Sequence, residues 1–128
     1  MNQKEIEVSN SIISKYSPNN DPNDFFCLTV SDNAAEPKFC PGDLLIIKMS
    51  NTLEYDGQLL IVHHNEEYLL RRVFYDDTAD IYILKDYCGI YPPVIVTDED
   101  DFFICGYPVQ LLRDLNPVYK KEGSLNDE

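Results

Sequence analysis

The chain has 128 residues, 44% of them hydrophobic, which suits a single domain with one modest core. Its 10 basic and 23 acidic residues give a formal net charge of −13, and this argues against contact with nucleic-acid phosphates, which needs a basic surface. No apolar run reaches the roughly 18 residues of a membrane span, and the N-terminal MNQKEIEVSNS lacks the pattern of a secretory signal. We therefore expect a cytoplasmic protein that binds neither membranes nor nucleic acid.

Residues 1–24 are predicted to form an arm and linker ahead of the domain. Ile6, Ile12 and Ile13 give this segment a weakly amphipathic helical pattern, and the stretch SPNNDPND that ends it has the composition of a linker. The isoleucines are apolar enough to dock on the domain. The linker would equally permit a disordered tail, so both outcomes stay open.

Turn signals separate seven apolar segments that are predicted as strands. These are Phe25–Val30, Leu44–Met49, Gln58–His64, Tyr68–Tyr75, Ile81–Lys85, Val94–Thr97 and Phe102–Leu112. The last strand is expected to bend at Gly106-Tyr107-Pro108. Short strands with almost no helix predict an all-β domain over residues 25–114, followed by a polar tail over 115–128.

Four pieces of the sequence carry a resemblance to a known family. They are VSDNAAEP at 30–37 with Gly42-Asp43 and an apolar strand, YDGQLLIV at 55–62, EYLLRRV at 67–73 and FICGYPV at 103–109. Their order and spacing resemble the self-cleaving Ser-Lys peptidase domain of LexA, UmuD and phage repressors, over about Phe26 to Leu112. The family patterns are roughly V-x-G-x-S-M-x-P, N-G-Q-V-V-V-A, E-x-x-V-K-R-L and F-x-I-x-G-x-V. The resemblance implies a LexA-like fold, in which twisted antiparallel sheets form a partly closed β-barrel.

The same resemblance implies that the catalytic dyad is degenerate. The nucleophilic Ser position is Ala34 and the general-base Lys position is Arg71. Alanine has no nucleophilic atom, and a guanidinium group stays protonated in proteins and cannot act as a base. Family members cut an Ala-Gly or Cys-Gly bond upstream of the Ser, and residues 1–25 contain neither pair. We therefore expect no enzyme activity, unless Ala34 and Arg71 are engineered changes in an active self-cleaving regulator.

On the family template Arg71 points into the old active-site cleft, with Asp32, Asn33, Ala35 and Glu36 as its candidate binding residues. There Arg71 could pair with Asp32, Glu36 or another carboxylate, so that an ion pair takes the place of catalysis. No cofactor is expected.

The remaining candidate residues favour ordinary structural roles. Cys27, Cys40, Cys88 and Cys105 lack paired metal-ligand spacing and are expected to be free thiols, most of them buried. His63 and His64 are adjacent on a strand and point to opposite faces, so they cannot easily share one metal. Ser31 is expected to be structural, and Asp98–Asp101 is expected to be a solvated acidic turn.

The resemblance implies a homodimer that pairs through its C-terminal strand, with Val109 and Leu111 as candidate interface residues. A domain that binds without cutting would suit a regulator in a prophage, mobile-element or SOS-type transcription circuit, with a repressor or another regulatory protein as partner. An UmuD-like polymerase accessory factor is an alternative that fits the short arm and the lack of a DNA-binding domain. An acidic DNA mimic is a further alternative, but it rests on charge alone.

Overall fold

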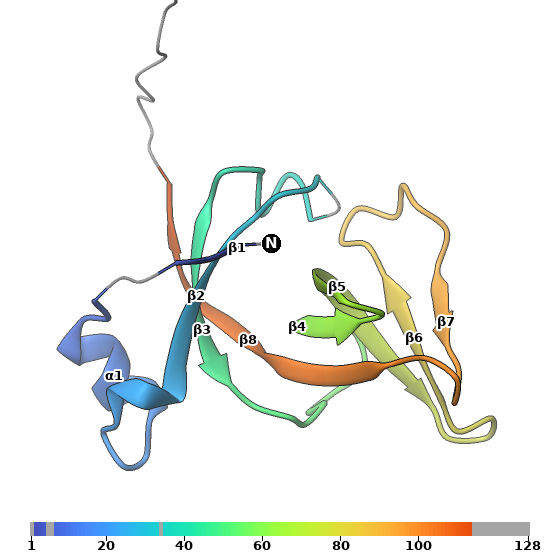
Figure 1. Cartoon of the computed structure of the whole chain (residues 1–128), viewed down its shortest axis with the longest axis horizontal. Helices are drawn as coiled ribbons and strands as arrows, with labels where there is room; N and C mark the ends of the chain where they lie inside the picture. The colour runs from blue at the N-terminus through green and yellow to red at the C-terminus, as the bar shows by residue number, and fades with distance from the viewer. Residues whose placement is uncertain (1, 5–6, 34, 114–128) are drawn as a thin grey trace, which may run out of the picture.

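The computed structural model describes residues 2–4, 7–33 and 35–113, with the backbone alone described for residues 2–4 (Figure 1). One sheet of eight strands dominates it, in the order β1-β2-β3-β8-β4-β5-β6-β7, and every pairing is antiparallel. The strands are β1 Asn2–Lys4, β2 Phe25–Thr29, β3 Leu44–Met49, β4 Gln58–His64, β5 Glu67–Asp76, β6 Ile81–Lys85, β7 Val94–Val96 and β8 Phe102–Leu112. The helices are α1 Asn10–Tyr16 and the short 3-10 helix η1 Pro22–Asp24. The all-β prediction is confirmed.

The predicted strands β3, β4, β6 and β8 have the expected bounds. Strands β2 and β7 end one residue earlier than predicted, and β5 is one residue longer at each end. Strand β1 was missed because its sequence, NQK, has no apolar signal, and only its pairing with β2 makes it a strand. No helix in the described part of the chain is long and apolar enough to cross a membrane. The predicted polar tail lies outside the described residues.

Strand β8 joins the two halves of the sheet. Its first part, up to Gly106, pairs with β4, and the part from Gly106 onward pairs with β3, with register shifts where the predicted bend occurs. Gly106 is required at this crossing because a Cβ atom there would lie 2.2 Å from the carbonyl oxygen of Lys48. Past Gly106, the edge of β8 that faces away from β3 has no strand partner among the described residues.

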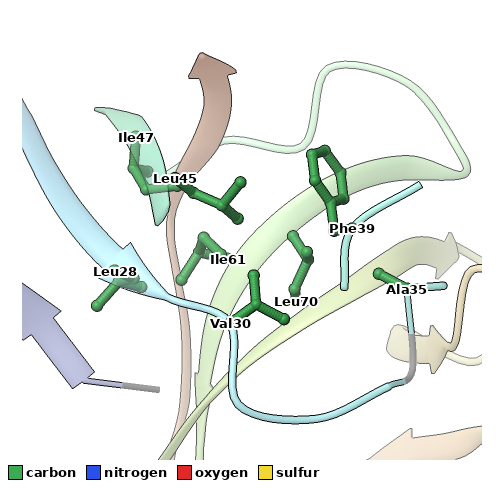
Figure 2. Packing of buried hydrophobic residues seen from close by; sticks show 8 residues of the cluster. All are labelled: Leu28, Val30, Ala35, Phe39, Leu45, Ile47, Ile61 and Leu70. Atoms are coloured by element: carbon green, nitrogen blue, oxygen red, sulfur yellow. The ribbon is translucent and has the colours of Figure 1, made fainter. Parts of the chain in front are cut away.

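Two hydrophobic clusters fill the two faces of the central strands. The first contains Leu28, Val30, Ala35, Phe39, Leu45, Ile47, Ile61 and Leu70 (Figure 2). The second contains Leu60, Val62, Val73, Leu84, Val96 and Ile104. Successive residues of β4 alternate between the two clusters, which explains why its sequence is continuously apolar rather than alternating with polar residues.

A third cluster attaches the arm to the sheet. The side chain of Ser9 caps helix α1 by accepting a hydrogen bond from the Ile12 amide, and this places Ile13 against Phe25, Cys27 and Ile46. These residues point to the face of β2 and β3 opposite the first cluster. Docking of the arm is therefore confirmed for the partly buried Ile12 and the buried Ile13, whereas Ile6 lies outside the described residues.

We expect Ile13→Ala to destabilise the protein by about 2–4 kcal/mol, because it opens a cavity between α1 and the sheet. Ile12→Ala is the matched control and should cost clearly less, since Ile12 is only partly buried. Urea unfolding of both variants measures the difference. A negligible loss for Ile13→Ala, or amide exchange in residues 13–17 as fast as in a free peptide, would show that the arm does not dock.

Candidate functional site

The polar turn between β2 and β3 lies over one end of the first hydrophobic cluster. Its ends are joined by two backbone hydrogen bonds, from the Val30 amide to the Asp43 carbonyl and from the Gly42 amide to the Val30 carbonyl, both 2.8 Å long. Within the turn, Ala35 and Phe39 bury their side chains in the cluster (Figure 2). The turn is thus a packed part of the domain and not a free loop.

The buried carboxylate of Asp43 connects this turn to the end of β8. Nε and Nη2 of Arg113 donate to its two oxygens at 2.8 and 2.6 Å, and the Cys40 amide donates to Oδ2 at 2.8 Å. The Arg113 hydrogen bond, helped by that of Cys40, lowers the pKa of Asp43 although burial opposes the shift. Sequence reasoning missed this pair because nothing local relates two residues that lie far apart in the chain.

Arg71, on β5, lies next to the turn. Its Nη1 is 3.6 Å from Oδ2 of Asp32 and donates a hydrogen bond of 2.9 Å to the carbonyl oxygen of Leu70. The predicted pairing with Asp32 is therefore confirmed. The side chain of Arg71 is largely buried, with 17% exposed. A guanidinium group held in this way can donate to an anion or a carbonyl group but cannot accept a proton.

The loop between β6 and β7 forms the second wall of the site, beside the turn (Figure 1). The hydroxyl of Tyr91 donates to Oδ1 of Asn33 at 2.6 Å. Asp86 is buried at the start of this loop, and its Oδ2 accepts from the amides of Ile90 and Tyr91 at 2.7 and 2.9 Å. Burial alone would raise the pKa of Asp86, but the backbone hydrogen bonds outweigh it and the pKa is lowered. This wall had no recognisable sequence signal.

The predicted cleft residues lie in different environments. Asp32 and Asn33 face Arg71 and Tyr91, as described above. The buried Ala35 contributes to the core, and the half-buried Glu36 donates its amide to the Asn33 carbonyl at 3.2 Å. Ala34 lies outside the described residues.

The candidate interface residues of β8 are half-buried in the monomer. Val109 packs against the arm cluster and Leu111 against the first cluster. Both residues, with Tyr107 and Pro108, line a hollow of about 420 Å³ where β8 separates from β4. The open edge of β8 borders this region.

The other polar residues form ordered structural contacts. Asp100 accepts hydrogen bonds from the Thr97 amide and the Asn65 side chain, which lower its pKa to about 2, so the acidic turn is ordered and not simply solvated. His63 stacks on Phe103 with ring centroids 4.7 Å apart, and His64 lies 3.5 Å from Asp100.

All four cysteines are free, but only Cys27 is fully buried. Among the described residues, no group of His, Cys, Asp and Glu could hold a metal ion.

We expect Asp43→Asn to destabilise the protein by about 1–3 kcal/mol at neutral pH, because it removes a buried charge-assisted acceptor. The folded-state pKa of Asp43 lies below the unfolded value of about 4, so its contribution is present above that pH and is lost as the pH falls through the folded pKa. Urea unfolding at pH 7 and at about pH 2 should show the two proteins converging in acid. If the difference in unfolding free energy between the two proteins is the same at both pH values, this account is contradicted.

The comparisons with known proteins agree with this arrangement. A model of the Peptidase S24-like family matches residues 2–109, which include the sheet up to β8, the turn and Arg71. No curated protein matches the chain. Because this model matches most of the chain, the chain belongs to the Peptidase S24-like family.

Proposed function

We propose that this chain is a catalytically inactive S24-type domain that acts by binding protein segments without cutting them. The observation that carries the proposal is the contact of Arg71 with Asp32 at 3.6 Å, at the position where the family's mechanism needs a neutral lysine. A Ser-Lys peptidase requires a base that can lose its proton, and a guanidinium group beside a carboxylate keeps its charge.

The sequence adds two further arguments. Ala34 provides no nucleophile, and residues 1–25 hold no Ala-Gly or Cys-Gly bond. The arm also packs through Ile13 onto the face of β2 and β3 that is opposite the first cluster. An arm held there by its own hydrophobic contacts functions as a structural element and not as a substrate.

We place this domain as a dimerising regulator in a prophage, mobile-element or SOS-type transcription circuit, where it would engage a repressor or a related regulatory protein. Past Gly106 the outer edge of β8 pairs with no strand in the described part of the chain, and this supports dimerisation, because an exposed strand edge is a template for pairing with a second chain. Val109 and Leu111 flank that edge. A net charge of −13 supports a protein partner over DNA.

The purified chain should not cleave itself. After incubation at about pH 10, near the ordinary pKa of lysine, the intact mass should be unchanged. The double variant Ala34→Ser with Arg71→Lys should also stay whole, because its arm lacks the scissile pair. A discrete N-terminal truncation of the unaltered chain would overturn the proposal.

A peptide with an Ala-Gly bond, added in trans, tests the site without the arm. The unaltered chain should leave this peptide intact, and any turnover by the double variant would trace the loss of activity to residues 34 and 71. Cleavage by the unaltered chain would show that it is an enzyme.

The chain should form a homodimer at micromolar concentration, measured by light scattering. Leu111→Glu should shift the equilibrium to monomer, whereas Ile95→Glu, which changes an exposed apolar residue on the distant edge strand β7, should not. Heteronuclear spectra of both variants check that they are folded. If the unaltered chain is still a monomer well above micromolar concentration, dimerisation is contradicted. If both variants shift the equilibrium to monomer equally, the interface at β8 is contradicted.

A further inference from the structure

Two cations lie side by side on the β5–β6 hairpin. Arg72 and Lys85 are direct partners in the antiparallel register, so their side chains leave the same face of the sheet. Like charges in this arrangement repel and destabilise the sheet. Among the described residues neither cation is within 4.0 Å of a carboxylate, although the chain has 23 acidic residues. No ion pair among the described residues therefore neutralises these two cations.

The ring of Phe74 holds both cations in place. The centre of the ring lies 5.2 Å from the guanidinium carbon of Arg72 and 4.8 Å from Nζ of Lys85. Gly57 makes room for the arginine, because a Cβ atom there would lie 3.2 Å from its Nη2. The two positive groups are thus positioned by packing and not by neutralising partners.

Both cations line a hollow of about 270 Å³, which we call the dication pocket, together with the loop between β6 and β7. Tyr87, Tyr91 and Pro93 give it partly apolar walls. The buried carboxylate of Asp86 also lines it: Oδ2 accepts hydrogen bonds from loop amides, whereas Oδ1 has no hydrogen-bond partner among the described residues. A third cation, Lys38, lies over the ring of Tyr87 at 5.6 Å. Positive charge is therefore concentrated at this end of a strongly acidic chain, where it would attract anions.

We propose that the dication pocket binds a carboxylate side chain of an acidic peptide segment from a partner protein. The guanidinium of Arg72 can donate two parallel hydrogen bonds to a carboxylate, Lys85 adds a second positive charge, and the aromatic walls cover the apolar stem of the side chain. The pocket adjoins the candidate site through the hydrogen bond from Tyr91 to Asn33. The inference rests on the proposed function, since it supplies a specificity element for the same non-cleaving site.

Titration of the isotope-labelled full chain with two peptides tests the pocket without any mutation. The probes are acetyl-Gly-Val-Glu-Val-Glu-Gly-amide and its counterpart with both glutamates changed to glutamine. The glutamate peptide should shift the amide signals of residues 85–91 in a saturable manner, and the glutamine peptide should not. If the two peptides shift these amide signals equally, the proposal is overturned. Inorganic phosphate that competes as well as the glutamate peptide also overturns it, because the pocket would then be a simple anion site.

Variants assign the binding to the two cations. Arg72→Gln and Lys85→Gln should each weaken binding by at least about tenfold, as expected for loss of a charge-assisted hydrogen bond. Lys48→Gln is the matched control, since it makes the same change in net charge on β3, where Nζ donates to the Met49 carbonyl. If Lys48→Gln weakens peptide binding as much as Arg72→Gln and Lys85→Gln do, the effect is one of general electrostatics, and the proposed pocket is contradicted.

Charge reversal separates binding from folding. Lys85→Glu should abolish binding and also raise the thermal midpoint, because it creates an opposite-charge pair with Arg72 across the strands. Unchanged binding by this variant contradicts the proposal.

The mass of the peptide after titration tests the proposed function independently. Cleavage of the peptide would refute the proposed inactivity but would leave the dication pocket standing. If the peptide binds but shifts only amide signals near Arg71, the pocket is refuted and the proposed function is not.

Discussion

The charge-assisted contact between Asp43 and Arg113 determines the geometry of the candidate site. A buried carboxylate is tolerated only when its oxygens are satisfied, and here the end of β8 and the Cys40 amide satisfy them. The contact closes the turn between β2 and β3 over the first hydrophobic cluster. In this position Asp32 contacts Arg71 on β5, and Asn33 accepts a hydrogen bond from Tyr91 in the loop between β6 and β7.

The site formed in this way consists of donors and fixed charges. The cations around the turn and the neighbouring loop are Arg71, Arg72, Lys85 and Lys38. The carboxylate of Asp32 contacts Arg71, and Oδ2 of Asp86 accepts hydrogen bonds from loop amides. Such a site can hold an anionic or carbonyl-bearing group, which is the chemistry that the proposed binding role needs.

Apolar runs and turn residues identified strands β2 to β8, because each of them has apolar residues that are buried in the fold. The same reasoning could not find β1, which has no apolar residue. The contact of Arg71 with Asp32 was predictable only because the resemblance located both residues near one cleft. The contacts of Asp43 with Arg113 and of Tyr91 with Asn33 depend on the three-dimensional path of the chain, so no local pattern encodes them.

The position of β8 has a consequence for how the molecule is made. This strand is the last among the described residues, but it lies in the middle of the sheet and provides the pairing between β1-β2-β3 and β4-β5-β6-β7. A nascent chain that ends before Phe102 can form two separate sheets but cannot join them. Assembly of the central ladder must therefore wait until translation of β8 is complete, and it then depends on contacts between distant parts of the sequence, which form slowly. Until that moment the apolar strands β3 and β4 each have an unpaired edge, so synthesis of this domain passes through a stage prone to aggregation.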